Sequence, residues 1–289
     1  MVKALFENLN PKPHASFLVN TFILERFTVP YHFHPELELT LIIKGKGERF
    51  VGKNMENFDA GDLVFLGSDL PHSWKSEATS DGEFNSQSIV VHFEKDFLGP
   101  EFFQKPELAG IQNLIKRSAY GIRFLNETAE ETKEKMKVLA AEENIFRKML
   151  MLLDILDDLA TTKDYVLLDQ DGIVAQQANN NKERINASLG YIVENFRNEI
   201  LLDKVAAVAN MSPNAFCKYF KRVTNKTFME TVIEYRINFA VRQLLSTDKA
   251  VADISMESGF GDISHFYKLF KKRMKTSPLN YRKKFQKGL

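Results

Sequence analysis

A pattern that occurs twice, 50 residues apart, is the strongest constraint on how the C-terminal part of this chain folds. The segment VAAVANMSPNAFCKYFKRV begins at Val205, and the similar segment ISMESGFGDISHFYKLFKKR begins at Ile254. The order Phe, Lys, Phe, Lys at positions 216, 218, 220 and 221 recurs at 266, 268, 270 and 271. Self-similarity at a fixed spacing indicates a duplicated structural unit.

Each copy predicts two short helices joined by a turn. The first helix is rich in small residues, which let another helix cross closely. The second helix begins at a capping residue, Ser212 followed by Pro213 in one copy and Asp262 in the other. Phenylalanines four positions apart then form one apolar face.

The opposite face of each second helix carries side chains that can bind a base edge or a phosphate. In the first copy these are Asn214, Cys217, Lys218 and Lys221. In the second they are Ser264, His265, Lys268 and Lys272, with Lys271 beside them. A merely solvated charged face would need neither these polar groups near the helix start nor a duplicated frame. The pattern therefore predicts two recognition helices of helix-turn-helix units.

The stretch between the copies, FMETVIEYRINFAVRQLLST, contains no Gly or Pro and predicts one long helix. About 18 helical residues span about 27 Å. Successive major-groove segments on one side of a duplex lie about 34 Å apart. We therefore expect a rigid connector that lets a single chain reach two of them.

Residues 184–285 resemble the DNA-binding domain of the AraC family of bacterial transcription regulators. The matching motifs are RINFAVRQLL, ISMESGFGDISHFYKLFKK and TSPLNYR. The resemblance implies base-facing positions at Asn214, Cys217, Lys218, Ile263, Ser264, His265 and Lys268. Asn225 and Lys275 depart from it, because each stands where the family usually has glycine.

Charge divides the chain into two parts. Residues 181–289 contain 20 Lys and Arg against 10 Asp and Glu, whereas residues 1–180 contain 19 against 28. A basic part indicates a nucleic-acid partner, and an acidic part a separate task. The single cysteine, Cys217, excludes an intramolecular disulfide framework and fits a cytoplasmic location. The sequence contains no run of about 18 apolar residues, so it predicts no membrane-spanning helix.

The N-terminal part predicts an α+β, multidomain chain. Short runs rich in Val, Ile, Phe and Thr between residues 14 and 98 indicate many strands, hence a sandwich or a small barrel. We expect an effector-sensing barrel at 1–100, a helical dimerisation region at 101–166, a linker at 167–182 and a double helix-turn-helix DNA-binding domain at 183–289. Within the helical region one apolar stripe serves either the chain's own core or a dimer seam. The stripe comprises Ile145, Met149, Leu152, Leu156 and Leu159.

The motifs HFHPELELTLIIKG and GDLVFLGSDLPH resemble the two motifs of the cupin barrel. In cupin enzymes the matching residues, His32, His34, Glu38 and His72, hold a divalent metal. The regulator resemblance favours a pocket with no metal or other cofactor, in which these residues and the only tryptophan, Trp74, bind an effector. That effector is expected to be a small organic molecule such as a sugar.

Together these observations predict a ligand-responsive transcription factor that is not an enzyme. Its expected partners are operator DNA, an effector, a second copy of the chain as a homodimer, and RNA polymerase, as for an activator. Two alternatives remain open. One is a metal-dependent cupin enzyme with an appended DNA-binding domain, and the other is a constitutive DNA-binding protein whose barrel only dimerises.

Overall fold

The computed structural model describes residues 5–6, 16–76, 86–169, 179–224 and 226–285. These residues form two compact units, a β-rich unit up to residue 169 and a helical unit from residue 179. Most of the predicted linker, and Asn225, lie outside the described residues. No described helix is long and apolar enough to cross a membrane.

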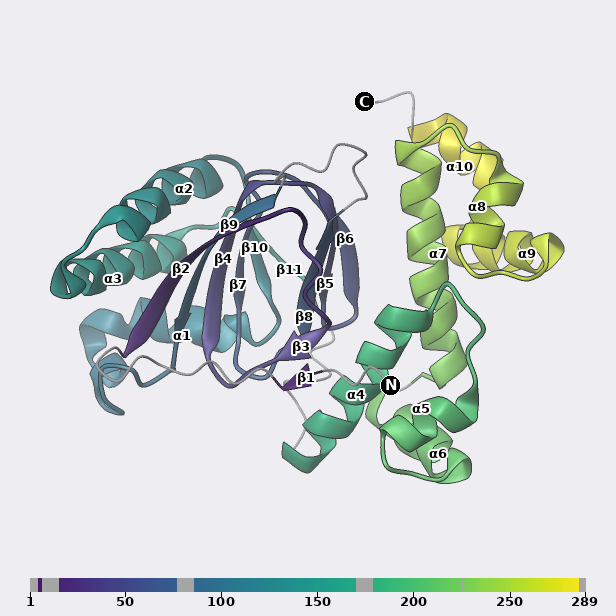
Figure 1. Cartoon of the computed structure of the whole chain (residues 1–289), viewed down its shortest axis with the longest axis horizontal. Coiled ribbons are helices and arrows are strands. Elements are labelled where there is room, and N and C mark those ends of the chain that lie inside the picture. The colour runs from purple at the N-terminus through teal and green to yellow at the C-terminus, as the bar shows by residue number, and fades with distance from the viewer. Residues whose placement is uncertain (1–4, 7–15, 77–85, 170–178, 225, 286–289) are drawn as a thin grey trace. The chain divides into compact units, whose positions relative to one another are not determined.

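The β-rich unit contains two sheets (Figure 1). The larger has the order β11 (Tyr165–Leu167), β10 (Ile122–Phe124), β7 (Leu63–Leu66), β4 (Leu37–Lys44), β9 (Ser86–Phe93) and β2 (Phe17–Leu24). The smaller has the order β1 (Leu5–Phe6), β3 (His32–Phe33), β8 (His72–Ser76), β5 (Gly47–Val51) and β6 (Asn54–Phe58). Its β1–β3 pair is parallel, and the other described pairs are antiparallel.

The ladders form two separate sheets and do not close into one cylinder in the described residues. The prediction of a β-rich N-terminal region followed by a helical C-terminal region is confirmed. The closed, cupin-like barrel is not observed.

Strand β4 shows how the larger sheet divides its two faces. Leu37, Leu39 and Leu41 pack in the core that the sheet shares with helices. Successive side chains of a strand point to opposite faces, so Glu38 and Thr40 face the other way. Both are buried polar residues. The alternation therefore reserves one face of β4 for packing and the other for a polar site.

Helices α1 (Ala109–Ser118), α2 (Asn126–Ala141) and α3 (Ile145–Thr161) cover the packing face of this sheet (Figure 1). Two short 3-10 turns, Phe102–Gln104 and Pro106–Leu108, precede α1.

The predicted dimer seam on α3 is wrong at its centre. Leu152, Leu156 and Leu159 are fully buried in the chain's own core. Met149 packs at the edge of that core, and Ile145 is 53% exposed. The stripe therefore serves the first of the two alternatives, because α1 and the sheet already cover it.

The helical unit comprises α4 (Asn179–Asn195), α5 (Leu202–Val208), α6 (Pro213–Thr224), α7 (Phe228–Ser246), α8 (Val251–Glu257), α9 (Ile263–Met274) and α10 (Pro278–Phe285). α7 is the predicted connector, and the pairs α5–α6 and α8–α9 are the two copies of the repeat. Both turns pass through the left-handed region, at Asn210 (φ 54°) and Gly259 (φ 84°). A left-handed residue just after a helix end redirects the chain sharply, so each pair can cross at a helix-turn-helix angle.

Two arginines in the motifs that resemble the AraC family bind backbone carbonyls within this unit. Arg236 on α7 donates to the carbonyl oxygens of Phe196 and Asn198, at 2.6 and 2.8 Å. Arg282 on α10 donates to those of Leu244 and Lys249, at 3.1 and 2.7 Å. Part of the matching signature is therefore architectural, since it satisfies carbonyls at helix ends.

Candidate functional site

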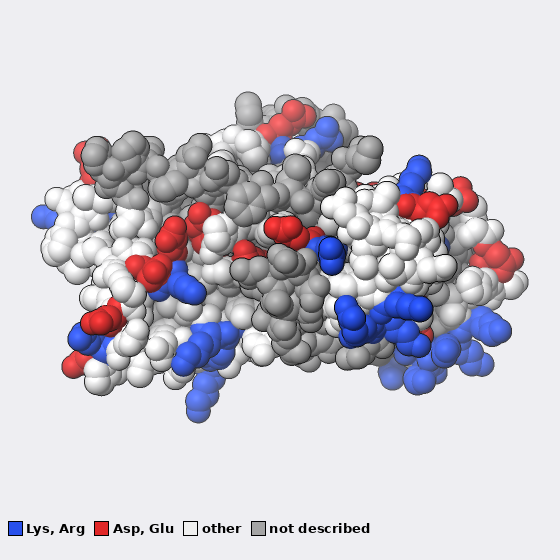
Figure 2. Space-filling view, turned by 90° about the horizontal axis from the view of Figure 1, so that it is seen from below, with Lys and Arg blue, Asp and Glu red and all other residues white. Residues whose placement is uncertain are grey.

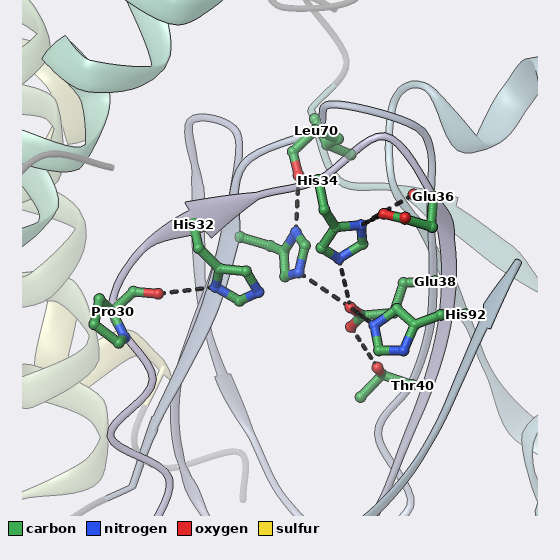
Figure 3. Close-up of polar contacts among 9 residues, drawn as sticks. Pro30, His32, His34, Glu36, Glu38, Thr40, Leu70 and His92 are labelled. Atoms are coloured by element: carbon green, nitrogen blue, oxygen red, sulfur yellow. Dashed lines mark hydrogen bonds and ion pairs between the residues drawn. The ribbon is translucent and has the colours of Figure 1, made fainter. Parts of the chain in front are cut away.

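The β-rich unit brings three of the predicted histidines to one carboxylate. The donor atoms of His32, His34, Glu38 and His72 all lie within 4.8 Å of one another, and all four residues are buried. His34 Nε2 lies 3.0 Å and His72 Nε2 3.2 Å from Glu38 Oε2. Figure 3 shows the labelled ring of His34 directed at the carboxylate of Glu38, and the ring of His32 farther from it, beside Pro30. The predicted set is thus a structural cluster.

Backbone carbonyls fix the tautomer of each ring in the cluster. Nδ1 of His32 donates to Pro30 O at 2.9 Å (Figure 3). Nδ1 of His34 faces Glu36 O at 3.2 Å, and Nδ1 of His72 faces Leu70 O at 2.8 Å. A carbonyl oxygen can only accept, so Nδ1 carries the proton in each ring. In a neutral imidazole, Nε2 then carries a lone pair.

Burial lowers the pKa of His32 to about 3, with a further lowering from His72. His32 is therefore a neutral ring at pH 7. Burial by itself would raise the pKa of Glu38, but the electrostatic influence of His72 and hydrogen bonds with His34 and His92 hold that pKa well below its usual value. The cluster thus combines neutral imidazole with an ionised carboxylate.

His92 is a fifth member of the cluster. Its Nε2 lies 2.9 Å from Glu38 Oε2, and its Nδ1 is buried with no hydrogen-bond partner among the described residues. The sequence interpretation treated this residue only as part of a strand. The signal was the alternation in β9, whose residues 86, 88, 90 and 92 share one face, together with the cross-strand pairing of His92 with Glu38.

A cavity of about 160 Å³ adjoins the cluster. Its polar lining consists of His32, Glu38, Thr40, Ser88 and His92. Its apolar lining consists of Phe22, Leu24, Phe27, Val29, Ile42, Trp74 and Val90. Phe22 and Val29 are 40% and 41% exposed, so the cavity reaches the surface at their edge.

Trp74 is held against this cavity by a buried polar contact. Its indole Nε1–H donates to Asp62 Oδ2 at 3.4 Å, and Asp62 also pairs with the buried guanidinium of Arg49. The predicted effector-binding residues therefore divide. His32, Glu38 and Trp74 line the cavity, whereas His34 and His72 belong to the cluster and do not line it.

The helical unit places all the predicted DNA-facing residues at its surface. Phe216, Phe220, Phe266 and Phe270 are fully buried. The exposed residues are Asn214, Cys217, Lys218 and Lys221 on α6, and Ile263, Ser264, His265, Lys268, Lys271 and Lys272 on α9. Asp262 caps α9 by accepting a hydrogen bond from the backbone N–H of His265.

Basic residues end both helices, namely Lys221 and Arg222 on α6 and residues 271–273 on α9. Figure 2 shows Lys and Arg side chains gathered along one edge of the helical unit. A basic face beside two helices with exposed polar sides has the electrostatic footprint of a nucleic-acid interface.

Comparison with known proteins supports this interpretation of the helical unit. Residues 205–284 match the family model described as a helix-turn-helix domain. The HTH-type transcriptional regulator YdeC of Bacillus subtilis is 24% identical, with 88% of this chain and 86% of the relative covered. The HTH-type transcriptional activator RhaS of Klebsiella pneumoniae is 23% identical, with 90% and 89% covered. The melibiose operon regulatory protein of Escherichia coli is 24% identical, with 87% and 83% covered.

Residues 205–284 carry an AraC-family helix-turn-helix domain. The chain is a sequence-specific DNA-binding transcription factor. These relatives share both units of the regulator, because the similarity extends over most of each chain.

The resemblance to cupins implies a bound metal ion. The three buried histidines and the glutamate of the cluster fit such an ion. His72 Nε2 is buried, points at an ionised carboxylate and has no hydrogen-bond partner among the described residues. In the neutral tautomer, the lone pair of His72 Nε2 faces a lone pair of the Glu38 carboxylate. These lone pairs repel each other, and a cation bound between them would remove the repulsion. Metal-binding histidines usually donate their other ring N–H to a carboxylate or a backbone carbonyl, and Nδ1 of His32, His34 and His72 faces such a carbonyl here.

His32, His34, His72 and Glu38 would therefore hold the ion, and this donor set suits Fe, Mn, Ni or Zn. The bound ion would supply positive charge and open coordination positions. The donor set therefore fits a metal ion, whereas the sequence led us to expect a pocket without one.

Proposed function

We propose that this regulator responds to a small molecule bound in the β-rich unit. The observation that carries the proposal is the cavity beside the histidine cluster, lined by five polar and seven apolar residues. A cavity in one unit and a recognition surface in the other divide sensing from DNA binding. An effector acts by having different affinities for two arrangements of the chain. The β-rich unit is, in this proposal, a cupin-like sensor with an incompletely closed barrel.

The cavity-filling substitution Val90→Phe tests the proposal, with Val166→Phe, the same change at an exposed site on β11, as the matched control. The operator is first defined by mapping the DNA that the protein binds in its native genome. A reporter carrying that operator should lose its response to growth conditions in Val90→Phe cells and keep it in Val166→Phe cells. Both purified variants should still bind the operator. An unchanged response in Val90→Phe cells would contradict sensing through this cavity.

We further propose that each chain reads two successive major-groove segments, one with each copy of the repeat. α7 has 19 residues and therefore spans about 28 Å. Footprints of His265→Ala and Asn214→Ala should differ from wild type at base pairs about one helical turn apart. Changes at the same base pairs would contradict two separate readers.

The proposed regulator is a cytoplasmic homodimer that activates transcription through RNA polymerase. The RhaS relative is named a transcriptional activator, which supports the direction of regulation. The dimer surface is shifted from the predicted seam to the outer edge of α2 and α3. There Val138, Ile145, Phe146 and Leu150 are 57%, 53%, 61% and 48% exposed. Sedimentation of Phe146→Ser should show monomers, and an unchanged dimer would place the contact elsewhere.

The clustered histidines favour one alternative, a metal-dependent cupin enzyme joined to a DNA-binding domain. We prefer a regulator without catalysis, because the relatives that match along most of the chain are transcriptional regulators. Turnover of a small molecule by metal-loaded protein, lost in His34→Ala, would reverse this preference.

A further inference from the structure

The lining of the cavity indicates which class of molecule the regulator senses. We infer that the effector is a compact, mainly apolar monoanion whose oxygen head group binds at a metal held by His32, His34, Glu38 and His72, and whose neighbouring hydroxyl is read by His92. This inference rests on the proposed sensing function. It replaces the sugar expected from the sequence.

Size and polarity exclude a sugar first. A cavity of about 150 Å³ lined by apolar side chains holds a molecule the size of benzene, and this one measures about 160 Å³. A sugar carries hydroxyls all round its ring, each of which needs a partner when buried. Here seven of the twelve lining residues are apolar, among them Phe22, Phe27 and Val90, and four of the five polar ones come from the neighbouring strands β4 and β9.

The charge of the head group follows from the cluster. Glu38 is the one carboxylate among the described residues that line the cavity. Alone, its negative charge would repel an anion. A divalent ion held beside it gives a local net charge of +1, which favours a single negative head group. The metal therefore decides whether the site prefers an acid or a neutral alcohol.

His92 supplies the second recognition contact. Its Nε2–H donates to Glu38, which leaves Nδ1 as an acceptor that is buried without a partner among the described residues. An unpaired buried acceptor is costly, and a ligand O–H would satisfy it. Because His92 lines the cavity, a hydroxyl next to the acidic group can reach this ring.

The test uses full-length protein loaded with Co²⁺ and three aromatic probes, phenylacetate, 2-phenylethanol and mandelate, with glucose as the sugar. Trp74 is the only tryptophan and lines the cavity, so its fluorescence reports occupancy. Cobalt absorption reports direct coordination. Phenylacetate should change both signals and bind at least about tenfold more tightly than 2-phenylethanol, which corresponds to about 1.4 kcal/mol. Mandelate should bind more tightly still, and glucose should leave both signals unchanged.

Two perturbations separate the parts of the inference. Chelator-treated wild type and His34→Ala should both lose the preference for acid over alcohol, although His34 does not line the cavity. His92→Phe should keep the cobalt spectrum and phenylacetate binding but erase the advantage of mandelate.

Equal binding of the acid and the alcohol in loaded protein would overturn the inference, as would binding of glucose or no response to any probe. None of these results tests whether the regulator responds to a small molecule bound in this cavity. The proposed function is decided separately, by the reporter response of Val90→Phe.

Discussion

Leu152 distinguishes a core helix from a dimer seam. Its side chain is fully buried in the chain's own core, whereas Leu150, on the same helix, is 48% exposed. Leu152→Ala removes three buried carbons, worth about 2.4 kcal/mol at about 0.8 kcal/mol each. The cavity left behind raises the expected loss in free energy of unfolding to about 3–4 kcal/mol. Leu150→Ala, with the same chemistry at the surface, should cost less than about 1 kcal/mol.

Urea unfolding followed by Trp74 fluorescence measures this difference in stability. The only tryptophan lies in the β-rich unit, which also contains Leu150 and Leu152. Sedimentation of the same two variants reports self-association. The reasoning is refuted if Leu152→Ala unfolds at the same urea concentration as Leu150→Ala while its dimer dissociates. That result would mean that a second chain, and not α1 and the sheet, covers Leu152.

The helical unit offers three further tests. Lys272→Ala should weaken binding to operator and scrambled DNA alike and reduce the salt slope by about one. His265→Ala should cost about 1–3 kcal/mol of binding free energy on the operator only. Anisotropy titrations across a salt series measure the binding of both variants. Equal losses on operator and scrambled DNA for His265→Ala would exclude a base contact. Cys217 is the chain's single cysteine and is exposed on α6, so operator DNA should slow its reaction with a maleimide, and an unchanged rate would place this part of α6 outside the interface. Lys275 follows α9 in the left-handed region, with φ 59°. Lys275→Gly should therefore stabilise the helical unit by about 1 kcal/mol, measured by thermal unfolding followed by circular dichroism. A lower melting temperature would show that the lysine side chain contributes more than its backbone strain costs.

The helix-turn-helix units could be predicted from the sequence because their determinants are local. A recognition helix needs buried side chains four residues apart, a cap and an exposed polar face, and all three lie within about a dozen residues. The buried Phe216 and Phe220 and the exposed Lys218 follow that pattern directly. The turn after α9 is also determined locally. Lys275 stands where the family usually has glycine, and the structure places this lysine in the left-handed conformation that glycine favours.

The orientation of α3 could not be predicted in the same way. Periodicity shows that Leu152 and Leu156 share a face with Met149, but not what covers the face. α1 and strands of the larger sheet, more than 25 residues away along the chain, provide that cover. The neighbouring apolar residues Phe146 and Leu150, which look no different in sequence, remain at the surface.

The histidine cluster depends on contacts between two sheets, which explains both what was predicted and what was missed. His32 and His72 pair with each other on the smaller sheet, whereas Glu38 and His92 pair on the larger one. The motif spacing identified the residues near the two turns, but His92 lies 54 residues from Glu38 and joins them only through strand register. A carboxylate that is 4% exposed is unfavourable unless several donors or a cation neutralise it. Because those partners come from both sheets, the charge at Glu38 helps to hold the sheets together at the wall of the cavity. In the proposed sensor, a ligand that changes the charge at this wall would therefore act on the joint between the sheets, and this joint would transmit the bound state to the rest of the unit.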